Sequence, residues 1–452
     1  MTTAKLVHLA DLETIYDDPE RVAGLVREIR SLPEERTLVV GSGDTTALGA
    51  LSFVTDEGRE FARPLYEAIE PDADTLGNHE FDFGTDWACE WVRTTPGTHL
   101  LANVDGLGSA PTEPHAVVDV DDLTVGLVGV THPETAELSG IDLDVTVSDP
   151  VEAVAREAAR LREFDCDWIV VLSHCGGLDE RIAAETDVDA VLGGHDHERV
   201  VEVVDSTLVA RTRGGQAGEF QLLSVETTGA DASAADGVTV ERREIPTAPA
   251  TEGVAATYRD WYRESGLAAQ IATLPSALDR RQTAAVVARA YQSPPDVDVG
   301  IVTPGSVRGG LPKTVTRGDV VGVVPFGSTL DVHRIDGEAL ATLAAETGEP
   351  IDETHGRLIT AGIERGETGE FPVADETGEF PVADEAGKFT VNEEPLDPSD
   401  WYRVACMSYL TVVDAVPAIG ESTLLERRGA QHEYVVSAVE NGGAVEQVRD
   451  RQ

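Results

Sequence analysis

An α/β fold is predicted by two patterns that alternate along the chain. Short apolar runs, which are typical of buried strands, alternate with segments whose apolar residues recur at the i, i+3, i+4 spacing of amphipathic helices. The 452 residues are enough for two or three domains, and 41% hydrophobic with 26% charged residues indicates a soluble globular protein. No apolar run approaches the roughly 18 residues of a membrane-spanning helix, so we expect none.

The first block opens with a predicted strand and continues with alternating elements. Strands are expected at Lys5–Ala10, Thr37–Val40, Thr98–Val104, Leu123–Val130, Asp167–Leu172 and Ala190–Leu192. Helices are expected at Arg21–Arg30, where Pro19 stands near the start, and at Val151–Glu163. Residues 198–227 indicate two or three antiparallel strands.

A change of composition near residue 229 separates this block from a second one. Residues 229–237 are all Gly, Ala, Asp or Ser and predict a surface loop, and residues 254–274 carry a long helical pattern. We therefore expect one domain at residues 1–228, a linker and connecting helix at 229–275, and a second α/β domain at 276–452.

The second block repeats the α/β theme. A helix is expected at Ala284–Tyr291 and a strand at Val297–Val302. The nonapeptide at residues 367–375 recurs unchanged at 376–384, and we expect it to form a duplicated surface hairpin or loop.

The charge of the chain is strongly negative and dispersed. Asp and Glu number 83 against 34 Lys and Arg, a net charge of −49, and only Lys5, Lys313 and Lys388 are lysines. Such a surface repels nucleic acids and anionic membranes, so neither is an expected partner. Dispersed acid with little lysine is typical of a halophilic archaeon's high-salt cytoplasm. Because Met1–Ala10 lack the basic and apolar segments of a secretory signal, the expected location is cytoplasmic. The oligomeric state stays open.

Polar ligand residues follow several predicted strands directly. The segments are Asp11-Leu12-Glu13, Gly43-Asp44, Gly77-Asn78-His79-Glu80-Phe81-Asp82, Ser173-His174 and Gly193-Gly194-His195-Asp196-His197. Open α/β sheets bind their ligands at the carboxyl ends of their strands. Two divalent cations about 3.5–4 Å apart need a bridging carboxylate, further carboxylates and imidazoles. The segments therefore predict a dinuclear metal site with Asp44 as its bridge.

These motifs, in this order and spacing, resemble those of the metallophosphoesterase superfamily, and the form Gly-Asn-His-Glu-Phe-Asp is typical of its 5′-nucleotidase branch. Gly305–Arg308, Thr316–Val320 and Val324–Gly327 resemble that branch's C-terminal, substrate-binding domain. The resemblance implies an α/β sandwich with a catalytic dinuclear centre, a linker helix and an α/β substrate-binding domain. It implies hydrolysis of a 5′-nucleotide or related small phosphoester by metal-bound hydroxide.

The resemblance also implies roles for individual residues. One cation would be held by Asp11, Glu13, Asp44 and His197, and the other by Asp44, Asn78, His174 and His195. His79 would stabilise the transition state or protonate the leaving oxygen, with Asp82 as its orienting carboxylate. The substrate-binding residues would be Arg308, Phe326 and Tyr409, of which Arg308 binds the phosphate end.

The chain departs from the family pattern at several positions. The first motif is usually Asp-x-His, whereas Glu13 stands here, either as a ligand or pointing into solvent. As a ligand, its oxygen favours Mn²⁺, with Zn²⁺, Mg²⁺ or Co²⁺ as alternatives. Thr303-Pro304 precede the arginine segment, residues 358–363 are without an aromatic ring, and Val413–Val416 replace a Gly-Gly-Asp-Gly element.

Three functions follow from the motifs and these departures. The first is a 5′-nucleotidase-like hydrolase, the second a phosphodiesterase for cyclic or sugar nucleotides, and the third a catalytically inactive ligand-binding relative. Retention of His79 with Asp82 argues against the third. His132 follows the predicted strand Leu123–Val130, and we expect it to have only a loop role.

Overall fold

A computed structural model describes residues 3–34, 37–46, 49–54, 61–120, 123–139, 143–226, 237–346, 358–365, 389–412, 416 and 418–442. The chain divides into two compact units, Met1–Trp261 and Tyr262–Gln452. The sequence predicts the end of the first domain at residue 228 and the start of the second at residue 276, and these limits stay a prediction. Within the described ranges, every helix is too short or too polar to cross a membrane.

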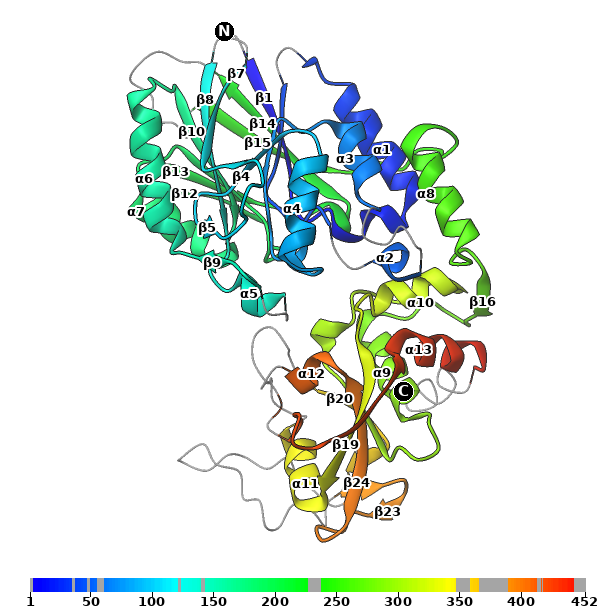
Figure 1. Cartoon of the computed structure of the whole chain (residues 1–452). Coiled ribbons are helices and arrows are strands. Elements are labelled where there is room, and N and C mark those ends of the chain that lie inside the picture. Colours follow the sequence, from blue (N-terminus) through cyan, green and yellow to red (C-terminus); the bar gives the residue numbers. More distant parts are fainter. Residues whose placement is uncertain are drawn as a thin grey trace. The chain divides into compact units, whose positions relative to one another are not determined.

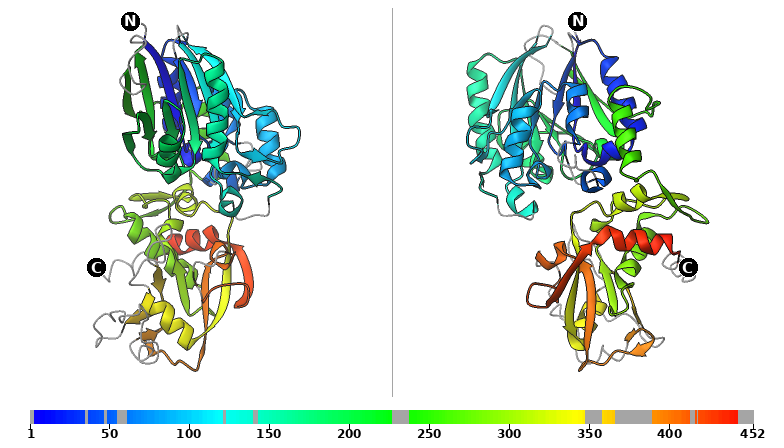
Figure 2. Two further views of the ribbon diagram at one scale, coloured as in Figure 1. Left: turned by 90° about the vertical axis from the view of Figure 1, so that its left-hand side faces the viewer. Right: turned by 45° about the vertical axis from the view of Figure 1, so that its right-hand side comes forward.

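The first unit is built on two sheets. One has the order β15 (Val238–Glu244), β14 (Glu219–Glu226), β1 (Thr3–Leu9), β2 (Thr37–Gly41), β3 (Ala73–Thr75), β4 (Thr98–Leu100), β6 (Thr112–Glu113). The other has the order β12 (Val200–Val204), β13 (Thr207–Arg211), β11 (Ala190–Gly193), β10 (Trp168–His174), β8 (Leu123–Thr131), β7 (His115–Val120). In Figure 2 the green β14 lies beside the dark blue β1, so distant parts of the chain share a sheet.

Helices cover the outer faces of the two sheets. Figure 1 shows α6 (Pro150–Glu163) and α7 (Asp179–Glu185) on one side, and α1 (Pro19–Arg30), α3 (Arg63–Ile69), α4 (Thr85–Thr94) and α8 (Gly253–Glu264) on the other. Leu6 and Val40 of one sheet belong to the same buried cluster as Leu127 and Val170 of the other. The main core of this unit therefore lies between the sheets, as in an α/β sandwich.

Parallel pairing sets the position of the strand ends. The strand β1 is parallel to β2, β2 to β3, β8 to β10, and β10 to β11. Their carboxyl ends therefore meet at one edge of each sheet, which is where the ligand-rich segments begin.

The second unit is a smaller α/β assembly. Its main sheet has the order β20 (Ile359–Ala361), β17 (Val299–Val302), β24 (Trp401–Met407), β19 (Thr329–Asp336), β25 (Leu424–Ala430). Its helices include α9 (Arg280–Gln292), α10 (Arg317–Val323), α11 (Gly337–Glu346), α12 (Tyr409–Val412) and α13 (Gln431–Glu440). A buried cluster that includes Ile301, Leu340 and Val404 forms its core. The predicted fold class, two α/β domains, is confirmed.

Three of the expected elements differ from the structure. The strand expected at Thr98–Val104 ends at Leu100, and Val104 belongs to a separate short strand, β5 (Val104–Asp105), which pairs with β9 (Thr146–Val147). The helix expected at residues 254–274 ends at Glu264, because Gly266 takes a left-handed φ of +79° and β16 (Gln270–Thr273) then pairs with β18 (Thr314–Thr316). Of the strands expected at residues 198–227, β12 and β13 do pair as antiparallel neighbours, but β14 joins the other sheet beside β1. The loop expected at 229–237 falls almost wholly outside the described residues, as do the repeated nonapeptides and residues 413–415.

Candidate metal centre

The predicted ligand residues meet at the carboxyl ends of the two sheets. Asp11 and Glu13 follow β1, Asp44 follows β2, and Asn78 follows β3. His174 is the last residue of β10, while His195 and His197 follow β11. Segments that lie far apart in the sequence are therefore brought to one place, although their role as ligands stays a prediction.

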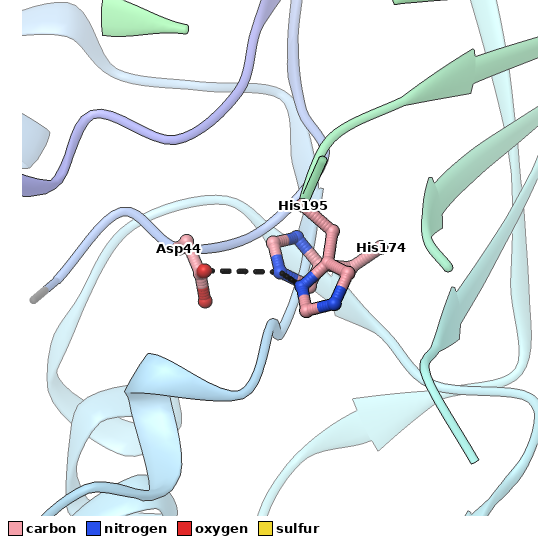
Figure 3. A group of neighbouring side chains, drawn as sticks. All are labelled: Asp44, His174 and His195. Atoms are coloured by element: carbon pink, nitrogen blue, oxygen red, sulfur yellow. Dashed lines mark hydrogen bonds and ion pairs between the residues drawn. The ribbon is translucent and has the colours of Figure 1, made fainter. Parts of the chain in front are cut away.

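One group of potential ligands is centred on His174. Its Nε2 atom lies 3.0 Å from Oδ2 of Asp44, 3.2 Å from Oδ1 of Asn78 and 3.3 Å from Nδ1 of His195. Figure 3 shows the two imidazoles next to each other with Asp44 on one side. Nδ1 of His174 donates to the carbonyl oxygen of Ser42 at 2.7 Å, so Nε2 is the nitrogen that would face a cation.

A second group is formed by Asp11, Glu13 and His197. Oε1 of Glu13 lies 2.8 Å from Nε2 of His197, and Oδ1 of Asp11 lies 3.7 Å from the same nitrogen. Glu13 is only 2% exposed, so it does not point into solvent. Ligand atoms of Glu13 and Asp44 lie within 4.8 Å of each other, so this group adjoins the first.

The backbone of this region is unusual. Among the predicted ligands, Asp11, Glu13, Asp44, His195 and His197 all have positive φ, between +39° and +80°. This left-handed conformation is uncommon for residues other than glycine and costs roughly 1–3 kcal/mol each. The turns that aim these side chains inward are thus held by their surroundings.

Two buried acidic residues support the turn that carries Asp44, and sequence reasoning missed both. Glu80 is 1% exposed and accepts hydrogen bonds from the backbone N–H groups of Asp44 at 3.0 Å, Gly77 at 2.7 Å and Thr46 at 2.8 Å. Asp74 is 3% exposed and accepts from the N–H of Gly43 at 3.1 Å, and also from the hydroxyls of Thr45 at 3.0 Å and Tyr66 at 3.1 Å. The only sign of their role in the sequence is their position: Asp74 lies within the buried strand β3, and Glu80 lies within the segment Gly77–Asp82 that carries predicted ligands.

Glycine is required where the ligand turns touch. A Cβ atom on Gly77 would lie 2.1 Å from Oδ1 of Asp44 and 2.7 Å from Cε1 of His174. Because real Cβ atoms do not approach other atoms so closely, any side chain here would push Asp44 and His174 out of their positions.

The charges in the cluster are strongly coupled. Burial raises the pKa of Asp11 to about 6, against the opposing effect of His197. Burial disfavours a charged His174, but the Asp44 carboxylate outweighs it and raises the pKa of His174 to about 10. The same partnership holds the pKa of Asp44 below its ordinary value despite its burial. As a ligand, His174 would have to lose its proton, so cation binding there would release a proton.

The chemistry of the cluster fits divalent cations. Within the described part of the chain, Oδ2 of the fully buried Asp11 accepts no hydrogen bond, an arrangement that costs free energy unless a cation approaches. Imidazole nitrogens suit transition metals such as Zn²⁺, and carboxylate oxygens suit harder cations such as Mn²⁺ and Mg²⁺. The residues therefore suit the cations that the motifs predict.

His79 and Asp82 form a pair beside the ligands. Nδ1 of His79 donates to Oδ2 of Asp82 at 2.6 Å, and the backbone N–H of His79 donates to Oδ1 of Asp44 at 2.9 Å. Burial disfavours the imidazolium, but Asp82 and Asp44 outweigh it and raise the pKa of His79 to about 10. The side chain also offers a ligand atom within 4.8 Å of Glu13 and Asp44, so geometry alone permits a ligand role as well.

The predicted substrate-binding residues lie in the second unit. The guanidinium carbon of Arg308 lies 5.4 Å from the centre of the Phe326 ring. Burial lowers the pKa of Arg280, and the positive charge of Arg308 lowers it further. Two arginines thus stand near each other in a chain of net charge −49. Tyr409 begins α12 and packs, like Phe326, against the core of this unit.

A two-sheet α/β sandwich with clustered carboxylates and imidazoles at its strand ends is an arrangement typical of metal-dependent phosphoesterases. Comparison with protein families agrees: residues 4–199 match the calcineurin-like phosphoesterases, and residues 264–415 match the 5′-nucleotidase C-terminal domain. The chain therefore carries a calcineurin-like phosphoesterase domain followed by a 5′-nucleotidase C-terminal domain.

Part of the chain is similar in sequence to an apyrase and to a 5′-nucleotidase. The chain is 36% identical to an apyrase of Aedes aegypti over 140 residues, which cover 28% of this chain and 25% of the apyrase. It is 32% identical to a human 5′-nucleotidase over 179 residues, covering 38% of this chain and 31% of the human protein. The matched region thus spans about a third or less of these relatives.

Solved structures share the fold over almost the whole chain. The 5′-nucleotidase precursor of Thermus thermophilus is 21% identical with a TM-score of 0.73, covering 97% of this chain and 96% of its own. A 5′-nucleotidase of Candida albicans is 14% identical with a TM-score of 0.68, covering 97% and 98%. At such identities the likeness concerns the two-domain fold alone.

Proposed function

We propose that the chain hydrolyses a 5′-nucleotide or a related small phosphoester at a dinuclear metal site. The observation that carries this proposal is the pair of adjoining ligand groups, one around His174 and one around His197, with Glu13 and Asp44 within 4.8 Å of each other between them. Two such groups suit two cations, and His79 with Asp82 adds a charged group beside them.

In this proposal each part of the site has a task. Asp11, Glu13, Asp44 and His197 would hold one cation, and Asp44, Asn78, His174 and His195 would hold the other. When bound, the two cations supply an ionised water nucleophile near neutral pH and neutralise charge on the phosphoryl oxygens. His79, charged through its hydrogen bond to Asp82, stabilises negative charge that develops on the phosphoryl group or gives its proton to the leaving oxygen.

The second unit supplies binding of the substrate. Arg308 offers a planar fork of donors that matches phosphate oxygens, and its neighbour Arg280 adds positive potential. Phe326 and Tyr409 offer aromatic surface for the remainder of the substrate.

The metal is proposed to be Mn²⁺ rather than Zn²⁺. The support is the oxygen of Glu13, buried beside Asp11 and His197, at a position where the family pattern has a nitrogen ligand. A larger share of oxygen donors favours harder cations.

A substrate panel tests the function. AMP, UMP, UDP-glucose, 2′,3′-cyclic AMP and bis-p-nitrophenyl phosphate are offered to the full chain with Mn²⁺, and again after dialysis against excess EDTA. We expect release of phosphate from AMP or UMP, loss of turnover with EDTA and recovery with Mn²⁺. Undiminished turnover after chelation would refute the metal site.

A phosphodiesterase for cyclic or sugar nucleotides is the second candidate. It is favoured by residues 358–363, which offer only aliphatic and small side chains where the family pattern has an aromatic ring for the base. Turnover of UDP-glucose or 2′,3′-cyclic AMP above that of AMP selects this candidate. No turnover of any member, with metal bound, leaves an inactive ligand-binding relative.

We also propose a high-salt cytoplasm as the working environment, on the dispersed net charge of −49 and the scarcity of lysine. At roughly 1 M salt the Debye length falls to about 3 Å, which suppresses repulsion among the acidic side chains. The unfolding midpoint should therefore rise between about 0.1 M and about 2 M KCl as screening increases, and a midpoint that falls would contradict this proposal.

A further inference from the structure

His132 lies at the same edge as the metal ligands. It directly follows β8, which is the parallel neighbour of the ligand-bearing β10. The structure places its imidazole against that of His195, with ring centroids 5.2 Å apart and an angle of 24° between the planes. His132 therefore stacks on a predicted ligand, which is more than the loop role expected from the sequence.

The two ligand histidines of this group are oriented differently. Nδ1 of His174 donates to the carbonyl oxygen of Ser42 at 2.7 Å, the usual way in which the second nitrogen of a metal-binding histidine is fixed. For His195, Nδ1 faces His174, and the described residues offer no hydrogen-bond partner to its Nε2. Its ring is half-buried on a residue whose φ is +80°. The carbonyl oxygen of Ser42 fixes the orientation of the His174 ring, whereas the orientation of the His195 ring depends on contacts with neighbouring rings.

Hydrogen bonds of His132 and of the preceding Thr131 fix the position of His132. Its Nδ1 accepts from the N–H of Glu134 at 3.2 Å, and its carbonyl oxygen accepts from the hydroxyl of Thr135 at 2.7 Å. The preceding Thr131 is fixed by Asn103, which accepts from its N–H at 3.0 Å and donates to its carbonyl oxygen at 2.8 Å. The ring that touches His195 thus has a defined position.

We propose that His132 is a positioning residue that holds the imidazole of His195 in its metal-binding orientation by ring stacking. The inference rests on the proposed metal site. It concerns the ligand group of His174 and His195, because His195, on which the ring of His132 stacks, belongs to that group.

Metal titration of the full chain tests the proposal without substrate. The chain is freed of metal by chelation and titrated with Mn²⁺ in a calorimeter, and two classes of site are expected for the unaltered chain. In His132→Ala, one class should weaken by roughly 10- to 100-fold, the range for groups that orient a metal ligand, and the other should stay unchanged. His132→Phe keeps an aromatic ring and should restore the affinity.

Two further variants separate stacking from other roles. His132→Gln keeps an acceptor for the N–H of Glu134 but has no ring, and should resemble His132→Ala. His115→Ala removes another half-buried histidine of the first unit, on β7 and hydrogen-bonded to Glu157, and should leave both classes unchanged. The unfolding midpoint of each metal-free variant is recorded alongside.

Each alternative outcome overturns a specific statement. Unchanged affinity in His132→Ala, or rescue by Gln and not by Phe, overturns stacking as the cause. Equal weakening of both classes with a lowered midpoint shows a general structural role and also overturns it. An unaltered chain that binds no Mn²⁺ refutes the proposed metal site instead, so the two failures are distinguishable.

Discussion

Replacement of Glu13 is the most direct test of the proposed metal site. Its carboxylate is 2% exposed, and Oε1 lies 2.8 Å from Nε2 of His197. If Glu13 is a ligand, then Asp11, Glu13 and Asp44 set three negative charges against the four positive charges of two divalent cations. Glu13→His lowers the number of negative charges from three to two and replaces an oxygen donor by a nitrogen donor. Zn²⁺ should then gain on Mn²⁺, because nitrogen donors suit it better.

The size of the effect follows from the contacts. Glu13→Ala removes one candidate ligand and the partner of His197. A hydrogen bond to a charged group contributes roughly 1.5–3 kcal/mol, and each 1.4 kcal/mol is a factor of ten in affinity, so binding to this group should weaken at least about 10- to 100-fold. Glu13→His keeps the number of ligands, so we expect a change of preference of about tenfold rather than a loss of one cation.

The assay is a titration of the metal-free chain with Mn²⁺ and, separately, with Zn²⁺, together with turnover under each metal. Glu20→His serves as control, since Glu20 is an exposed residue at the start of α1 and its replacement should change neither metal preference nor turnover. If Glu13→Ala binds the same number of cations with the same affinity and turns over normally, Glu13 is not a ligand and the reasoning fails.

Three further perturbations test other parts of the molecule. His79→Ala should lower kcat by roughly 10²–10⁴ with an unchanged metal content by elemental analysis, as for a charge stabiliser or acid rather than a ligand; loss of metal would reassign it. Arg308→Ala should raise KM for a phosphomonoester by roughly tenfold or more, since a charge-assisted contact contributes roughly 1.5–3 kcal/mol, and an unchanged KM would remove Arg308 from the substrate site. His99 is 1% exposed and burial lowers its pKa from 6.5 to about 4, so its neutral form favours folding fully above pH 6.5 and this contribution is lost as the pH falls toward 4. In urea unfolding, His99→Phe should therefore flatten the pH dependence between these values, and an unchanged slope would show that His99 already titrates normally.

Local patterns were sufficient to predict the elements that carry the site. An apolar run followed by a carboxylate or imidazole indicates a buried strand with a polar end, as at β1 with Asp11 and β10 with His174. Parallel pairing then brings those ends to one edge, so the grouping of these carboxylates and imidazoles could be expected before the structure.

Features of the structure that depend on tertiary contacts could not be predicted from the local sequence patterns. The path of β14 to the edge of β1 depends on pairing between residues such as Thr3 and Glu226, which no local pattern reveals. The stacking of His132 on His195 joins the ends of two strands from different parts of the chain. Whether Glu13 turned inward or outward was likewise fixed by the packing around it and not by its neighbours in sequence.

The left-handed turns explain why buried acidic residues are needed next to the site. Asp44 has a φ of +49°, which a non-glycine residue adopts only where its surroundings hold it there. Glu80 accepts from the N–H of Asp44, while Asp74 accepts from the groups on either side of it, Gly43 and Thr45. These acceptors fix the turn before any cation arrives. The strain therefore does not have to be overcome when a cation binds, and more of the interaction between cation and ligands appears as affinity.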